Sequence, residues 1–258
     1  MSVYGPLADF YDSLTEDVDY PGLYDYLMWH FRQGGVKLRR VLDMACGTGS
    51  LSMLFAARGV QTLGMDLSRE MLARAEDKAA RSKGGLLRFV QGNMADFSLD
   101  EPVDGVVCML DSFNYLTDPA EGVSAIGCFY KALAPGGMLI FDVRPRRQLM
   151  DFDGQMFMDE TQDVACIWRT EFLEEENLCF YGMDIFIREG ELWRREQEEH
   201  YEYAYRLRWL KERLSEAGFT DIHMYGDRTM DLPEPEDERV FITARKERRR
   251  WGTSWSGR

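Results

Sequence analysis

The sequence lacks the features of several common classes of protein. Its 258 residues include no run of about 18 apolar residues, so no membrane-spanning helix is expected. Residues 1–6 have neither a basic head nor an apolar stretch, so no secretory signal is expected. The five cysteines are scattered and include no CxxC pair, which argues against a disulfide framework and a metal site. We therefore expect a cytoplasmic protein with reduced cysteines and no bound metal.

Basic residues are outnumbered by acidic ones. The chain has 31 Lys and Arg against 45 Asp and Glu, which gives a net charge of −14. Such a charge opposes binding to a phosphate backbone, so no nucleic-acid partner is expected. The exception is a basic tail, residues 246–258, which we expect to be disordered. The alternative for this tail is a nucleic-acid-binding arm.

What the sequence does have is a strand–loop–helix junction at residues 41–58. A short apolar run ends near Asp43, and Gly47 and Gly49 form a turn before a helix that opens at Ser50. Glycine permits a tight turn and close approach of a ligand, and the helix start presents free N–H groups. A third glycine, needed for a nicotinamide pyrophosphate, is replaced by Ser52, and no GxxxxGK[ST] pattern occurs. The carboxylate suits a ligand with an ammonium or hydroxyl group.

From residue 39 to residue 143, strand and helix patterns alternate. Strands separated by helices indicate parallel pairing with right-handed crossovers, and ligands then bind at the carboxyl ends of the strands. The predicted strands are 39–43, 60–65, 86–90, 104–110 and 137–143. The predicted helices between them are 50–58, 68–82 and 119–133, and an earlier one spans 21–31.

Beyond Pro145 the pattern becomes a run of alternating strands. They are predicted at 164–172, 178–187 and 192–205, with turns at 174–177 and 188–190, and they form an antiparallel meander. A helix at 206–217, a strand at 220–225 and an antiparallel strand at 239–244 follow.

Residues 43–49 resemble motif I of the class I S-adenosylmethionine-dependent methyltransferases. The Leu-Ala-Pro-Gly-Gly segment at 133–137 and the Ala-Gly-Phe step at 217–219 are similar to segments of the same family. Tyr11-Asp12 and Asp19-Tyr20 resemble the N-terminal segment that folds over the cofactor in small-molecule members. The meander looks like the sheet that shapes substrate pockets in sugar and glycine N-methyltransferases. The resemblance covers about residues 4–245.

The resemblance implies an α/β, Rossmann-like, doubly wound fold. Its seven-stranded sheet is mostly parallel with an antiparallel last strand, and an antiparallel β meander is inserted. We expect four regions: an N-terminal helical cap at 1–35, a cofactor-binding core at 36–150 and 206–245, the meander at 151–205, and the tail at 246–258.

S-adenosylmethionine is the cofactor that the resemblance implies. Asp66, at a strand end beyond the glycine loop, would accept both ribose hydroxyls, with a plain helix-start acid as the alternative. Asn93 stands where the family usually has Asp, and its amide oxygen can accept the same bond from the adenine amino group. The expected cofactor-binding residues are Tyr11, Asp43, Ala45, Cys46, Gly47, Gly49, Asp66, Leu67, Met71, Asn93, Met94 and Leu110.

The methyl acceptor is less well defined. The chain has neither an Asn-Pro-Pro-Tyr or Asp-Pro-Pro-Tyr motif nor a Pro-Cys nucleophile after the fourth strand, so nucleic-acid methylation is not expected. We expect a small molecule with a nitrogen or oxygen nucleophile. If it arrives protonated, the candidate bases are His200, Asp111 and Tyr115.

Two alternatives remain at this point. The meander could pack on a second subunit in a homodimer instead of lining the acceptor pocket. The chain could also be a non-catalytic nucleotide-binding or regulatory partner subunit, while Asp43 and the missing third glycine argue against a nicotinamide oxidoreductase.

Overall fold

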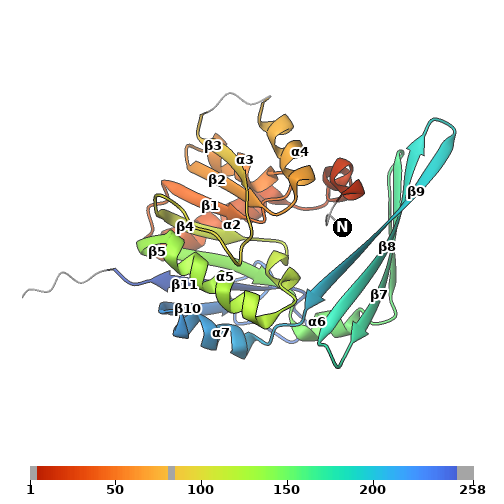
Figure 1. Ribbon diagram of the computed structural model, residues 1–258. Coiled ribbons are helices and arrows are strands. Elements are labelled where there is room, and N and C mark those ends of the chain that lie inside the picture. The colour runs from red at the N-terminus through yellow and green to blue at the C-terminus, as the bar shows by residue number, and fades with distance from the viewer. Residues whose placement is uncertain (1–4, 81–84, 249–258) are drawn as a thin grey trace, which may run out of the picture.

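The computed structural model describes residues 5–80 and 85–248, and its core is a seven-stranded mixed sheet (Figure 1). The strand order is β10-β11-β5-β4-β1-β2-β3, and β11 is antiparallel to both of its neighbours. The predicted Rossmann-like fold is therefore confirmed. The strands are β1 (Arg40–Met44), β2 (Gln61–Asp66), β3 (Leu87–Gln91), β4 (Val103–Cys108), β5 (Leu133–Val143), β10 (Phe219–Tyr225) and β11 (Val240–Lys246).

Strand order reverses between β1 and β4, which pair in parallel. In a doubly wound sheet this switch point leaves a crevice at the carboxyl ends of the strands. Both faces of the central strands are covered, so Leu42, Val106, Val107 and Ile140 are fully buried. This burial explains why the parallel strands read as continuous apolar runs and not as alternating patterns.

Helices cover the faces of this sheet (Figure 1). Two of them begin where the sequence indicates a start. In α2 the side chain of Asp19 accepts the N–H of Gly22, and in α5 the side chain of Asp118 accepts the N–H of Ala120, each with proline in the first turn. The helices are α2 (Tyr20–Gln33), α3 (Ser50–Ala57), α4 (Arg69–Ala79), α5 (Pro119–Ala132) and α7 (Leu207–Glu216).

The predicted meander is a separate antiparallel sheet that stands beside the core (Figure 1). Its strands are β6 (Met156–Glu160), β7 (Val164–Leu173), β8 (Leu178–Glu189) and β9 (Leu192–Tyr203). The two predicted turns are present, with Asn177 and Gly190 at φ 58° and 67°. The sequence did not predict β6, because all five of its residues are exposed and show no alternation. It also missed α6 (Arg146–Asp151) and the 3-10 helix η2 (Ser112–Tyr115).

The N-terminal segment lies between α4 and this second sheet (Figure 1). It comprises η1 (Pro6–Asp9) and α1 (Tyr11–Leu14). Leu7 is buried in one cluster with Val164, Met183 and Ile185 of the second sheet. The segment thereby connects the second sheet to the core.

Several boundaries differ from the sequence-based expectation by one to four residues, among them the following three. β5 begins at Leu133, not at residue 137, and β9 ends at Tyr203, not at residue 205. Lys246 closes β11 and donates to the carbonyls of Tyr130 and Leu133, so the expected tail does not begin there. Residues 249–258 of that tail lie outside the described residues. Within the described ranges, every helix is too short or too polar to span a bilayer.

Candidate cofactor site

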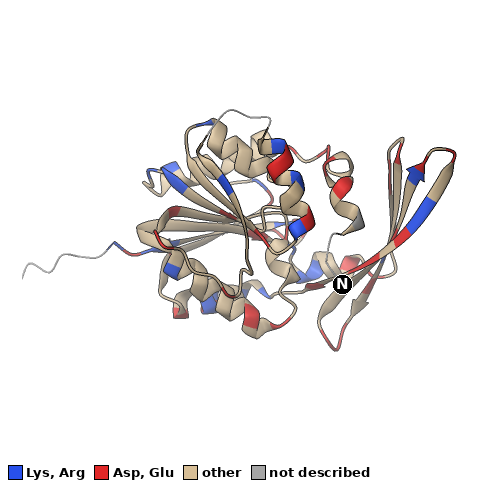
Figure 2. Cartoon of the chain, turned by 45° about the horizontal axis from the view of Figure 1, so that its top comes forward, with Lys and Arg blue, Asp and Glu red and all other residues tan. Residues whose placement is uncertain are grey.

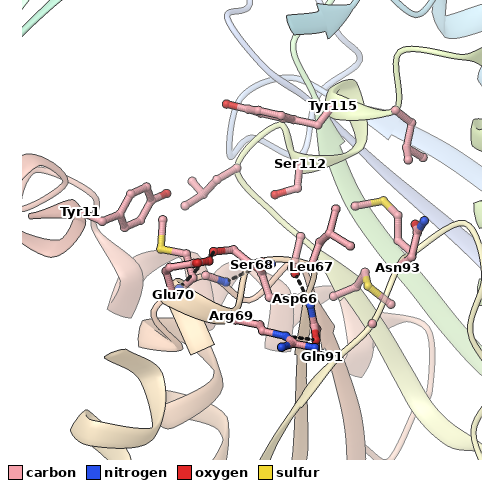
Figure 3. A pocket seen from close by; sticks show the side chains of 18 residues that line it. Tyr11, Asp66, Leu67, Ser68, Arg69, Glu70, Gln91, Asn93, Ser112 and Tyr115 are labelled. Atoms are coloured by element: carbon pink, nitrogen blue, oxygen red, sulfur yellow. Dashed lines mark hydrogen bonds between the residues drawn. The ribbon is translucent and has the colours of Figure 1, made fainter. Parts of the chain in front are cut away.

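A cavity of about 560 Å³ opens at the carboxyl ends of β1, β2, β3 and β4 (Figure 3). This volume is in the range of small-molecule sites. Its wall is formed by the loops that follow these strands and by Tyr11 of α1. A smaller cavity of about 40 Å³ shares part of that wall and reaches Asp43 and Tyr20.

Most residues expected to bind the cofactor line these two cavities. The large cavity is lined by Tyr11, Ala45, Gly47, Asp66, Leu67, Met71, Asn93, Met94 and Leu110. The small cavity adds Asp43 and Cys46. These residues, far apart in the sequence, come together because parallel strands end at the same edge of the sheet. That each one contacts a cofactor stays a prediction.

Gly49 is the exception, because it lines neither cavity. It is the N-cap of α3 with φ 77°, and a Cβ there would lie 2.6 Å from the ring of Phe89 and 3.1 Å from the Cβ of Ala75. Glycine is therefore required so that β3 and α4 can pack closely against the loop. Gly49 therefore has a packing role in addition to the ligand-binding role expected of it, which stays a prediction.

Gly47 behaves differently. It lines both cavities, and a Cβ built on it would meet no protein atom within 4 Å. A side chain at this position would therefore occupy the space that a ligand needs. Its φ of 54° lies in the left-handed region, which glycine adopts at little cost. Both properties fit a loop over which part of a ligand passes.

The carboxylate of Asp66 is fixed at the cavity wall by two backbone groups. Its Oδ2 accepts the N–H of Gly47 at 2.8 Å and its Oδ1 accepts the N–H of Ser68 at 2.8 Å. Burial raises the pKa of Asp66, and these two N–H groups oppose that rise. Each carboxylate oxygen has a further lone pair, so the group can still accept hydrogen bonds from two hydroxyls.

Asn93 is also held in place. Its Oδ1 accepts the N–H of Ala95 at 2.9 Å, which leaves one lone pair on that oxygen for a ligand donor. Sequence reasoning missed further residues of the large cavity: Met44, Ser68, Arg69, Glu70, Gln91, Gly92 and Leu116. All of them follow closely on a predicted strand end, so their position in the loops after the strands was the feature that could have identified them. In Figure 3, Ser112 and Tyr115 lie across the cavity from Arg69 and Gln91.

Asp43 is a buried carboxyl group with few partners. The hydroxyl of Ser52 donates to its Oδ2 at 2.5 Å. Burial raises the pKa of Asp43 from 3.8 to about 7. In the ligand-free protein, the carboxyl group is therefore partly protonated near neutral pH. A cationic ligand in the adjoining cavity would stabilise its ionised form.

Asp43→Asn is expected to raise the free energy of unfolding of the ligand-free protein by about 1–4 kcal/mol near pH 8. Near pH 4 it is expected to change this free energy little. The folded pKa of about 7 lies above the ordinary 3.8, so folding favours the protonated form. The stability gained from the protonated Asp43 is complete below the pKa of this group in the unfolded chain. It is lost as the pH rises through the pKa of the group in the folded protein. Urea unfolding across this pH range measures it, and parallel pH profiles for the wild type and the variant would contradict the assignment.

Of the three candidate bases, Tyr115 alone lines the large cavity. Its ring meets that of His200 edge-on, with centroids 5.9 Å apart. His200 is buried, lines neither cavity, and its Nε2 lies 3.1 Å from Oε2 of Glu198. The imidazole therefore supports the Tyr115 ring, and a role for either residue in proton transfer stays a prediction.

Asp111 belongs to a buried ion-pair network. Arg144 donates to its Oδ2, while Nη1 of Arg239 donates to its Oδ1 at 2.8 Å and to Oδ2 of Asp142 at 2.5 Å. Burial alone would raise the pKa of Asp111, but Arg239 and Arg144 lower it to about 2. A carboxylate this acidic is a poor base, and Asp111 lines neither cavity. Both observations argue against the expected role of Asp111 as a proton acceptor, which stays a prediction.

Comparisons with known proteins agree on one chemistry. A family model described as "Methyltransferase domain" matches residues 41–137. The chain is 30% identical over 246 residues to the "Putative methyltransferase YqeM" of Bacillus subtilis (strain 168), which covers 95% of this chain and 97% of that protein. It is 26% identical over 241 residues to a glycine/sarcosine N-methyltransferase of Halorhodospira halochloris, with 87% and 81% covered. A solved S-adenosylmethionine-dependent methyltransferase from Clostridium acetobutylicum matches with a TM-score of 0.84 at 26% identity, covering 95% of this chain and 99% of that one.

Proposed function

The chain belongs to the class I S-adenosylmethionine-dependent methyltransferases, and on this premise we propose that it methylates an amine of a small molecule. The bound cofactor supplies a methyl group that is already activated by a sulfonium. The chain's own residues then have to hold and align the two reactants, an effect worth up to about 7–11 kcal/mol. The observation that carries the proposal is the cavity at the switch point, with Gly47 and Asp66 on its wall.

Three groups of residues support the cofactor assignment. Gly47 leaves room for the methionine part, and Asp66 offers two acceptors to the ribose hydroxyls. Asn93 and Met94 line the cavity beyond Asp66, where the adenine would bind. Tyr11 closes the opposite side. Leu110, two residues after the end of β4, also lines the cavity.

Asp66→Ala is expected to weaken binding of S-adenosylhomocysteine by about 1–3 kcal/mol, because two hydroxyls lose their acceptor. Isothermal titration calorimetry measures this change. Asp100→Ala, which removes an exposed carboxylate, is the matched control and should bind normally. Unchanged affinity in the Asp66 variant would exclude the ribose assignment.

An amine acceptor is supported by the balance of charge at the strand ends. Carboxyl groups outnumber guanidinium groups at the strand ends and in the cavity wall: Asp43, Asp66, Glu70, Asp111 and Asp142 against Arg69, Arg144 and Arg239. Such a surplus attracts a cationic acceptor and repels an anionic one. The similarity to a glycine/sarcosine N-methyltransferase supports the same choice.

We further propose that the second sheet, within the inserted region 151–205, forms the acceptor side of the site. The inward face of β9 carries three buried ionisable residues, Glu198, His200 and Glu202. Tyr115, which contacts His200, would then contact the acceptor. Packing of this sheet on a second copy of the chain is the competing role.

The test uses S-adenosylmethionine with a labelled methyl group and a metabolite extract. Label is expected in the low-molecular-weight fraction and absent from nucleic acid and protein. Treatment of the extract with an amine-selective acetylating ester should remove the acceptor activity. Label that persists after acetylation would contradict an amine, and label in macromolecules would contradict a small-molecule acceptor.

A further inference from the structure

Residues 7–15, which we call the strap, contact both the cofactor cavity and the second sheet. Tyr11, in the middle of the strap, lines both cavities, and burial raises the pKa of its hydroxyl. Figure 2 shows acidic residues of the strap beside basic residues of α4. The position of the strap therefore decides whether Tyr11 covers the cavity.

On the core side, the strap is joined to the glycine loop through Lys78 of α4. Its Nζ donates to Oδ2 of Asp12 at 2.7 Å and to the hydroxyls of Thr48 and Ser50, both at 3.0 Å. The hydroxyl of Thr48 in turn donates to Oδ1 of Asp12. Thr48 and Ser50 flank the second glycine of the loop, so one ammonium group joins the strap, α4 and the loop.

A second ion pair links the same two elements but is more exposed. Arg74 pairs with Asp9, and their side chains are 47% and 54% exposed. In the pair of Lys78 with Asp12 the side chains are 25% and 46% exposed, and Lys78 has three acceptors, one of which, Thr48, is buried. Exposed pairs contribute little because water and salt screen them. Lys78 is therefore the stronger of the two connections.

On the other side, the strap is held by apolar packing. Leu7 is buried against Val164, Met183 and Ile185, and its N–H donates to Oε1 of Glu198 at 3.1 Å. Salt weakens ion pairs but does not weaken the burial of apolar groups. Separation of the strap from the cavity would thus begin at Lys78, while the contact with the second sheet persists.

We propose that Lys78 is a positioning residue for the cofactor: by holding Asp12 against the glycine loop, it keeps Tyr11 over the cavity and limits the rate of cofactor release. The proposal rests on the cofactor site proposed above. Lys78 itself lines neither cavity, so its effect on the ligand runs through the strap and the glycine loop that it holds together.

The test measures the dissociation rate of labelled S-adenosylhomocysteine in a chase experiment with the full chain. Lys78→Met is expected to release the ligand about tenfold faster, as for the loss of one charged hydrogen-bonded contact. Lys78→Arg keeps the charge and should restore most of the residence time. Rising salt should accelerate release from the wild type and have little effect on Lys78→Met.

Two controls separate this role from a general loss of stability. Arg208→Met removes an exposed ion pair with Glu212 on α7 and should leave the dissociation rate unchanged. The double variant Asp12→Asn with Lys78→Met should release the ligand no faster than Lys78→Met alone, because both changes break the same contact. Hydrogen exchange of residues 7–15 should rise in Lys78→Met while the thermal midpoint stays near that of the wild type.

The outcomes distinguish the two proposals. If the wild type does not bind S-adenosylhomocysteine, the cofactor site is wrong and the role of Lys78 falls with it. If the wild type binds and Lys78→Met releases the ligand at the wild-type rate, the role of Lys78 alone is wrong. Additive effects of Asp12→Asn and Lys78→Met would also contradict it.

Discussion

Gly47→Val is expected to abolish binding of S-adenosylhomocysteine, with the fold retained. A Cβ at Gly47 meets no protein atom within 4 Å, so the two added methyl groups would enter the cavity and not the core. The variant would also be strained, because a β-branched residue at φ 54° lies outside its favoured regions. Calorimetry would measure the binding, and circular dichroism would measure helix content.

The effect of backbone strain on binding has to be separated from the effect of filling the cavity with a side chain. Gly59 offers a matched control: it has φ 86°, a Cβ there also meets nothing within 4 Å, and it lines neither cavity. Gly59→Val therefore carries a similar backbone strain of about 1–2 kcal/mol and should bind normally. If Gly47→Val binds as well as Gly59→Val does, the glycine loop does not face the ligand.

Arg239→Met is expected to lower the free energy of unfolding by about 3–5 kcal/mol at neutral pH, because it leaves buried carboxylates without their partner. Arg239 pairs with both Asp111 and Asp142, and the side chain of Asp142 is 1% exposed. Arg144 continues to pair with Asp111, so the loss falls mainly on Asp142. Urea unfolding, with Arg208→Met as the control for an exposed pair, measures the difference.

The loss should depend on pH in a defined direction. Burial raises the pKa of Asp142, and Arg239 opposes that rise, so its removal raises the pKa further. A group whose pKa is raised in the folded protein contributes stability that is present at low pH and lost as the pH rises. The difference between the wild type and Arg239→Met should thus shrink as the pH falls from 7 toward about 4. A difference that is constant with pH would assign the effect to packing alone.

The sequence predicted the core sheet and most of the residues that line the first cavity, for one physical reason. Buried parallel strands read as apolar runs, and the residues that follow them must meet at one edge of the sheet. Asp66 and Gly47 were found by this rule, and they lie in direct contact. The rule cannot tell which residues of a loop face the ligand. It also did not reveal the packing role of Gly49, because the contact with Phe89 joins distant parts of the chain.

Asp111 shows a second limit of sequence reasoning. Its place at the end of β4 suggested a catalytic carboxylate, yet its partner Arg239 lies just before the last strand, β11, 128 residues away. Nothing in the local sequence indicates that pairing. The edge strand β6 was missed for a related reason: it is exposed along its whole length, so no burial pattern marks it.

Cavity size alone does not identify the ligand site. A second cavity of about 570 Å³ lies near the amino ends of β4 and β5, lined in part by Phe97, Cys128 and Lys246. The two volumes are nearly equal. The choice between them rests on topology and chemistry, because the first cavity lies at the strand-order switch and contains Asp66 and the glycine loop.

A crystal structure of the protein with S-adenosylhomocysteine is the most direct measurement of where the cofactor binds. We predict that the ligand occupies the cavity beneath Tyr11, with its ribose hydroxyls within hydrogen-bond distance of Asp66 and its amino-acid part over Gly47. Ligand density in the cavity beside Cys128, or in the first cavity without a contact to Asp66, would contradict the assignment.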